Sequence, residues 1–241
     1  MTTPNTSQAI RVHQLEISPF CDKVRRVLAY KGLDAEIINV PMGELGKLKK
    51  LSPIGKVPVV EIGSDVLVDS SDICRELDAR FPSPPLFPDA PAQRALVDIL
   101  EDWADESLYF FEMTMRFTWL HDRQRWVTEI LKYDNAIMQK LARPLVPYLT
   151  KKQGTNQGLA KRSEADILKE LTRHIASLEA MLDQGQQYLV GDALSLADIS
   201  VLAQLECIAG SSKGLPIIEN SPNVLAWMAR IESMTGGPAI R

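Results

Sequence analysis

The chain has 241 residues, of which 45% are hydrophobic and 24% are charged. These values are ordinary for a globular protein with one large domain or two modest ones. Lys and Arg number 27 against 31 Asp and Glu, so the formal net charge is −4. We expect no nucleic-acid or anionic membrane partner, because the chain carries no basic excess.

Location and metal content are predicted from what the sequence lacks. Residues 1–10 are polar without a secretory pattern, and no apolar run approaches the ~20 residues of a membrane helix. The three cysteines are too few and too scattered for a disulfide framework, which favours the reducing cytoplasm. The three histidines lie far apart and lack metal-ligand spacing, so we expect no metal site.

The N-terminal third alternates between strand and helix patterns. We expect strands over 11–16, 36–40, 57–62 and 65–68, and helices over 20–31, 44–51 and 71–81. The last two strands flank Gly63-Ser64, which favours a hairpin. This order predicts a compact α/β unit with one antiparallel pair.

Five prolines fall within residues 82–91, a density that excludes helix and strand and indicates a stiff linker. Beyond it we expect helices over 92–120, 123–149, 163–184, 195–209 and 222–234. A basic, glycine-containing loop is expected over 151–158. The predicted organisation is therefore an α/β domain over 1–82, a linker over 83–91 and an all-helical domain over 92–241.

Residues 17–25, ISPFCDKVR, join the first strand to the first helix. Pro19 lies just inside the expected helix and Gly32 just past its end. Ser18 then lies at the helix start, beside unpaired N–H groups and the positive end of the dipole, where an anion such as a thiolate is stabilised. The simpler interpretation is an ordinary Ser cap followed by a buried Cys21.

Four segments together resemble the soluble glutathione S-transferases over nearly the whole chain. They are SPFCDKVR at 18–25, LSPIGKVPVV at 51–60, VDSSDI at 68–73 and GDALSLADI at 191–199. The first motif is of the serine type, and the resemblance is to bacterial omega- and zeta-like members. It implies a thioredoxin-like N-terminal domain followed by an all-helical C-terminal domain that receives the electrophile.

The resemblance also implies a glutathione site on the α/β unit. Pro58 would be cis, so that the Val57 backbone faces an extended peptide. Asp69 would pair with the α-ammonium of the γ-glutamyl group. Ser70 would cap the helix that follows, and the first amides of that helix would bind the γ-glutamyl carboxylate. The residues expected to bind glutathione are Phe20, Lys56, Val57, Pro58, Asp69 and Ser70.

The segment 109–119 is rich in aromatic residues and methionine. In the family this helix borders the electrophile pocket, and a mobile apolar wall suits varied apolar molecules. The residues expected at this pocket are Tyr109, Met113, Phe117 and Trp126. Core packing is the competing interpretation for each of them.

The leading hypothesis is a glutathione S-transferase in which Ser18 donates a hydrogen bond to the glutathione sulfur and stabilises the thiolate. Glutathione would be the co-substrate, a small hydrophobic electrophile its partner, and detoxification by a cytoplasmic homodimer the family expectation. One alternative is a glutathione-dependent thiol reductase or peroxidase that uses Cys21, although the first Cys of a Cys-Pro-Phe-Cys motif is Ser here. Another is a non-catalytic glutathione- or hydrophobe-binding protein.

The fourth motif has a structural interpretation. Ser195 and Asp198 form the Ser-x-x-Asp version of a capping box ahead of an apolar run. We expect Asp198 to be buried and to serve folding rather than catalysis.

Overall fold

The computed structural model describes residues 9–183 and 185–236, so the outermost ends of the two predicted domains lie outside the described residues. The N-terminal third forms a sheet of four strands: β1 (Ile10–Gln14), β2 (Ala35–Asn39), β3 (Val59–Ile62) and β4 (Asp65–Val68). Their order is β2-β1-β3-β4, with β1 parallel to β2 and antiparallel to β3. The predicted β3–β4 hairpin is confirmed, whereas the second antiparallel pair, β1–β3, was not predicted.

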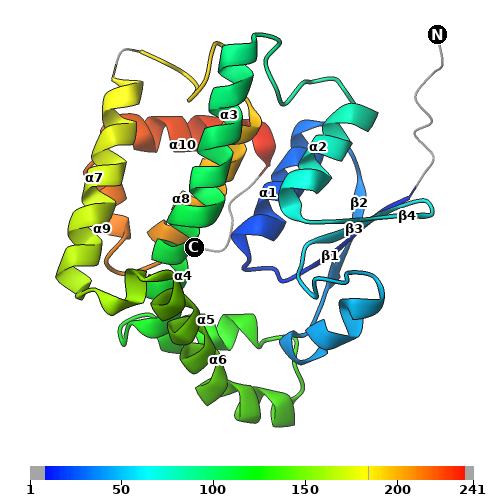
Figure 1. Ribbon diagram of the computed structural model, residues 1–241, viewed down its shortest axis with the longest axis vertical. Coiled ribbons are helices and arrows are strands. Elements are labelled where there is room, and N and C mark those ends of the chain that lie inside the picture. The colour runs from blue at the N-terminus through cyan, green and yellow to red at the C-terminus, as the bar shows by residue number, and fades with distance from the viewer. Residues whose placement is uncertain (1–8, 184, 237–241) are drawn as a thin grey trace.

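Two helices and one 3₁₀ helix complete this unit: α1 (Pro19–Tyr30), α2 (Ser70–Arg80) and η1 (Met42–Lys50). Figure 1 shows α1 and α2 between the sheet and the helices of the C-terminal part. One continuous hydrophobic core joins Val12 and Val60 of the sheet, through Val24 of α1, to the helices beyond. The α/β unit is therefore packed firmly against the helical part.

The C-terminal part is helical, as expected. Its elements are α3 (Pro91–Trp103), the π-helical turn η2 (Ala104–Leu108), α4 (Tyr109–Thr118), α5 (Arg123–Ile130), α6 (Ala136–Gln157), the 3₁₀ turn η3 (Leu159–Lys161), α7 (Glu164–Leu182), α8 (Leu196–Ala209), α9 (Leu215–Glu219) and α10 (Pro222–Thr235). Every residue of α8 is buried, and α8 packs on α1, α3 and α4. The fold is a thioredoxin-like N-terminal domain followed by a helical C-terminal domain (Figure 1).

Two predictions for residues 123–158 are wrong. The expected helix over 123–149 is interrupted before α6, which begins where the Asn135 side chain accepts a hydrogen bond from the Met138 amide at 3.0 Å. The expected loop over 151–158 is helical as far as Gln157. Gly154 serves packing, since a Cβ there would lie 3.0 Å from the Ala160 Cβ, and Gly158 ends the helix at φ +119°.

The capping box at the start of α8 forms as predicted. Asp198 is fully buried and accepts hydrogen bonds from the Leu189 amide at 2.8 Å and from the Ser195 amide and hydroxyl, each at 2.9 Å. Trp227 of α10 donates a fourth, at 3.0 Å. Within residues 9–183 and 185–236, no helix is long and apolar enough to cross a membrane.

Candidate active site

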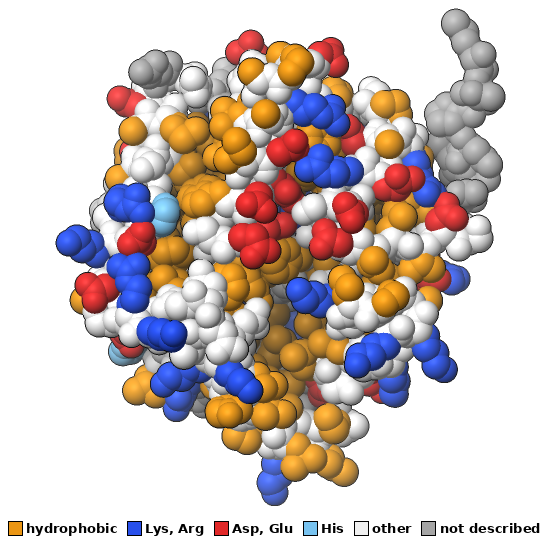
Figure 2. Space-filling model, viewed as in Figure 1, with side chains coloured by type: hydrophobic (Ala, Val, Ile, Leu, Met, Phe, Trp, Pro, Cys, Tyr) orange, Lys and Arg blue, Asp and Glu red, His pale blue; other side chains and the backbone are white. Residues whose placement is uncertain are grey.

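Two adjoining cavities lie between the α/β unit and the helical part. The smaller one, of about 280 Å³, is bordered by Phe20, Lys56, Val57, Pro58, Asp69 and Ser70 on one side and by acidic residues of α3 and η2 on the other. The larger one, of about 390 Å³, contains Ser18 and the apolar residues of α4. Both are lined by Phe20, Lys56 and Val57, so the two spaces meet. Figure 2 shows acidic side chains gathered near the centre of this face, beside exposed hydrophobic surface.

Ser18 is the N-cap residue of α1, at the border of the larger cavity. Its carbonyl accepts the Asp22 amide at 2.9 Å, which is the first bond of the helix. Among the described residues its side chain caps no helix amide; the hydroxyl instead forms a hydrogen bond with the Cys21 thiol. A cavity-lining hydroxyl at a helix start can rotate from this thiol toward an anion.

Cys21 lies one turn further along α1 and is 0% exposed. Burial raises the pKa of its thiol from 9.0 to about 11, more than the hydrogen bonds from Ser18 and the Leu15 amide lower it. Cys74 and Cys207 are also buried, and burial raises their pKa values as well. At neutral pH these three side chains are thiols that pack in the core.

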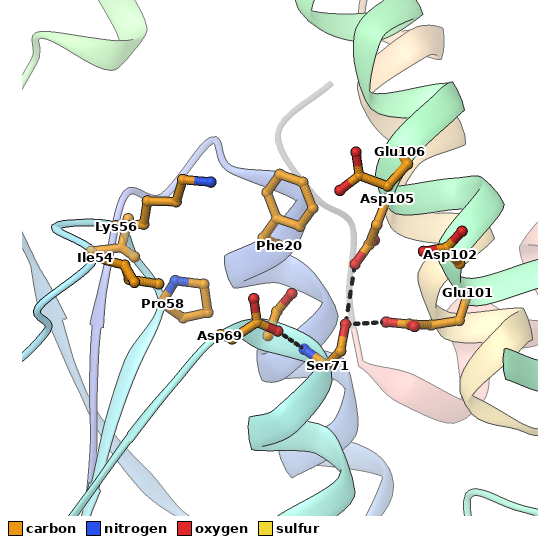
Figure 3. Close-up of a pocket in the computed structure, with 12 residues that line it drawn as sticks. Phe20, Ile54, Lys56, Pro58, Asp69, Ser71, Glu101, Asp102, Asp105 and Glu106 are labelled. Atoms are coloured by element: carbon orange, nitrogen blue, oxygen red, sulfur yellow. Dashed lines mark hydrogen bonds between the residues drawn. The ribbon is translucent and has the colours of Figure 1, made fainter.

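Val57 and Pro58 precede β3, and the peptide bond between them is cis, as predicted. Both residues border the smaller cavity together with Lys56, whose side chain points into it in Figure 3. The Val57 backbone thus lies at the cavity rather than inside the sheet, because β3 starts only at Val59.

Asp69 lies between β4 and α2, with φ +71° and ψ 126°, a left-handed conformation unusual for a residue other than glycine. Its carboxylate accepts the Ser71 amide at 3.0 Å (Figure 3). The sequence predicted Ser70 as the helix cap, but the cap is Asp69. A short carboxylate at this backbone angle reaches the amide two residues further along the chain. Ser70 is the first residue of α2 and also borders the smaller cavity.

The wall opposite Asp69 is acidic, which the sequence analysis missed. It is formed by Glu101, Asp102, Asp105 and Glu106 (Figure 3). The spacing of these residues, i, i+1, i+4 and i+5, places them on one helix face and could have revealed them. They add negative charge to this cavity. Among the described residues that line it, Lys56 alone is basic.

Two residues of this wall, Glu101 and Asp105, also belong to a buried ionic cluster that joins the two parts of the molecule. Lys23 of α1 donates to Glu101 at 2.7 Å and to Asp105 at 2.6 Å. The Ser71 hydroxyl of α2 donates to Glu101 at 2.5 Å. Burial raises the pKa of Asp105 even though Lys23 opposes this. The cluster fixes the start of α2, and with it Asp69, against α3.

The larger cavity is mostly apolar. Tyr109, Met113 and Phe117 of α4 line it, and Tyr109 packs on Phe20 of α1 with ring centroids 4.9 Å apart. Trp126 lies outside both cavities. It is fully buried and donates from its indole nitrogen to the Gly210 carbonyl at 3.3 Å, so it belongs to the core.

A buried ion pair also borders the larger cavity and escaped the sequence analysis. Glu112 and Arg116, one turn apart on α4, form a 2.8 Å contact with side chains 2% and 1% exposed. Arg116 also donates to the Ile17 carbonyl at 3.0 Å. The sequence could have revealed this pair, because two residues of opposite charge lie four positions apart within an apolar segment.

Residues 12–85 match the family model "Glutathione S-transferase, N-terminal domain" and residues 140–236 match "Glutathione S-transferase, C-terminal domain", together more than half of the chain. Glutathione S-transferase omega-1 of Rattus norvegicus is 25% identical over 231 residues, 92% of this chain and 76% of that protein. A probable glutathione transferase of Aplysia californica is 33% identical over 97 residues, 40% of this chain and 96% of that protein.

A solved glutathione S-transferase from Rhodospirillum rubrum superposes with a TM-score of 0.63 at 25% identity, over 93% of this chain and 88% of that one. Sequence and structure thus agree over both the α/β unit and the helical part. The chain belongs to the glutathione S-transferase family.

Proposed function

We propose that this protein activates glutathione through Ser18 and transfers it to a small apolar electrophile. A free thiol with a pKa near 8.5 is only a few per cent ionised at pH 7. A hydrogen bond from the Ser18 hydroxyl, together with the start of α1, would favour the thiolate. The observation that carries the proposal is Ser18 at a helix start, with a hydroxyl free of helix capping, on a cavity that adjoins Pro58 and Asp69.

Glutathione would lie in the smaller cavity. The Val57 backbone would pair with the cysteinyl part of the peptide, and Lys56 would contact the glycine carboxylate. The γ-glutamyl group would reach Asp69 with its α-ammonium and the start of α2, at Ser70, with its carboxylate. Phe20 would separate this peptide from the electrophile. This arrangement directs the sulfur toward Ser18 and the larger cavity.

The thiolate sulfur would attack the electrophilic carbon and displace its leaving group, while the thiol proton passes to solvent. Ser18 remains a hydrogen-bond donor throughout, so no covalent enzyme intermediate forms. The electrophile would rest against Tyr109, Met113 and Phe117, which offer an apolar and partly aromatic surface. Trp126 has no place in this proposal, because it is buried in the core.

The burial and raised pKa of Cys21 weigh against a reductase that uses this thiol as nucleophile. The test compares three variants. Ser18→Ala should lower turnover by about 10- to 1000-fold with little change in glutathione affinity, since the lost bond matters mainly to the charged sulfur. Cys21→Ala should keep conjugation, and Ser18→Cys should shift activity toward disulfide reduction. Loss of activity in Cys21→Ala but not in Ser18→Ala would refute the proposal.

We also propose a cytoplasmic homodimer, on the basis of family membership. Exposed apolar side chains along α6, with Ile137 73% and Leu141 64% exposed, offer a surface that a second copy could cover. Light scattering at micromolar concentration should give twice the mass of the chain, and a monomer mass would contradict this assignment.

A further inference from the structure

Ser18 lies on a short loop between β1 and α1, and the two residues before it are held by charged side chains. Arg25 of α1 donates to the Glu16 carbonyl at 3.2 Å. The next carbonyl, that of Ile17, accepts the hydrogen bond from Arg116 of α4 at 3.0 Å. One of these anchors comes from the same domain as the loop, and the other comes from the helical domain.

The Arg116 side chain is itself fixed on several sides. Glu112 holds it at 2.8 Å, and its guanidinium carbon lies 3.9 Å from the centre of the Trp126 ring. Trp126 is in turn locked by its bond to Gly210. A guanidinium that is stacked, paired and fully buried has little freedom, so it constrains the carbonyl that it binds.

The helical domain contacts the same loop at a second residue, Glu16. The Glu16 carboxylate accepts a hydrogen bond from the Tyr133 hydroxyl at 2.7 Å and pairs with Lys132 at 2.5 Å. These contacts are partly exposed, and they are weaker than the buried one because water screens them. The buried contact of Arg116 with Ile17 is therefore the main link from the helical domain to the residue before Ser18.

We propose that Arg116, held by Glu112, is a positioning residue that fixes the Ser18 hydroxyl at the place of the glutathione sulfur. The assignment rests on the proposed function of Ser18 and deepens it. Hydrogen bonds that stabilise an anion depend steeply on distance and angle, so a loop released by a fraction of an ångström loses part of the stabilisation. The helical domain thus supplies the electrophile cavity and also sets the geometry of thiol activation.

The main test is the double variant Glu112→Gln with Arg116→Met. It keeps the net charge and leaves no unpaired carboxylate in the core. We expect the apparent pKa of the bound glutathione thiol, read from thiolate ultraviolet absorbance, to rise by about one unit, which lowers the ratio of thiolate to thiol at a given pH about tenfold. The affinity for S-methylglutathione, which has no thiol, should stay unchanged. Arg116→Lys keeps the charge and one donor, so its shift should be in the same direction and smaller.

A matched control lies at the end of α1 opposite Ser18. Lys31 is fully buried, pairs with Asp78 at 2.7 Å and donates to the Phe81 and Pro84 carbonyls. The double variant Lys31→Met with Asp78→Asn should lower the melting temperature without moving the thiol pKa. The inference is overturned if this control raises the thiol pKa equally, or if the Glu112/Arg116 variant and Arg116→Lys both keep the wild-type value.

Failure of the inference and failure of the proposed function give different results. If the unmodified protein binds glutathione without lowering its thiol pKa, the function proposed for Ser18 is wrong and the positioning role falls with it. If the unmodified protein lowers that pKa and the Arg116 variants do so equally well, only the positioning role is wrong. Should the double variant fail to fold, Arg116→Lys carries the test alone.

Discussion

The indole nitrogen of Trp227 in α10 donates to Oδ1 of Asp198 in α8 at 3.0 Å. The same carboxylate accepts a hydrogen bond from the Leu189 amide and forms the capping box with Ser195. One buried side chain therefore ties α10 and the segment before α8 to the start of the central helix. This relationship links α8, on which α1 and α4 pack, to the outer helices.

Asp198→Ala should lower the free energy of unfolding by about 3 kcal/mol, because several buried N–H donors lose their acceptor. Urea unfolding measures this change. The matched control is Asp192→Ala, an exposed acidic residue of the same segment, which should change stability by less than about 0.5 kcal/mol. Glutathione affinity of the folded Asp198→Ala protein should match the wild type, and a large affinity loss at unchanged stability would contradict the structural role.

Asp69 combines a helix cap with the proposed contact to the glutathione ammonium, and two substitutions separate these roles. Asp69→Asn keeps a capping oxygen and tolerates φ +71°, but it loses the charge. Calorimetry should show glutathione binding weakened by about 1.5–3 kcal/mol, the scale of a hydrogen bond to a charged group. Asp69→Ala should show this loss and also lower the melting temperature. Equal affinity of Asp69→Asn and wild type would remove Asp69 from the site.

Gly210 packs against Trp126 so closely that a Cβ would lie 2.6 Å from the indole Cζ2. Gly210→Ala should therefore destabilise the protein by about 1–3 kcal/mol through overpacking. Gly46 makes a suitable control, since a Cβ there meets nothing within 4 Å. Chemical denaturation of Gly210→Ala and of Gly46→Ala tests the packing. Equal stability of the two variants would show that Trp126 can move aside without cost.

The buried cysteines predict slow thiol labelling. At pH 8 Cys21, with a pKa raised to about 11, is protonated and enclosed, so a disulfide reagent should modify it only on unfolding. The folded thiol binds its proton more tightly than the unfolded one, so its contribution to stability is lost as pH rises from 9.0 toward 11. Comparing the alkaline unfolding of wild type and Cys21→Ala isolates this effect. Rapid labelling of Cys21 in the native protein would revive the reductase alternative.

Local patterns in the sequence predicted the elements whose cause is local. The start of α1 follows from Pro19, the start of α8 from the Ser195–Asp198 box, and the β3–β4 hairpin from its short turn. The two-domain fold followed from the resemblance carried by these motifs. The sequence pattern wrongly predicted a loop over 151–158. Gly154 lies inside a helix, where the close packing of Ala160 leaves no room for a larger residue.

Contacts between distant segments were decided by the tertiary structure alone. The pairing of β1 with β3, the burial of Trp126 and the acidic wall facing Asp69 depend on how the helices pack on the sheet. The bond from Arg116 to the Ile17 carbonyl joins residues 99 positions apart. Sequence spacing holds no information about such a pair, since the packing of α4 against the β1–α1 loop is what brings them together. The sequence by itself thus determined the order of the elements and the place of Ser18 at a helix start, while the packing of the two domains decided what surrounds Ser18.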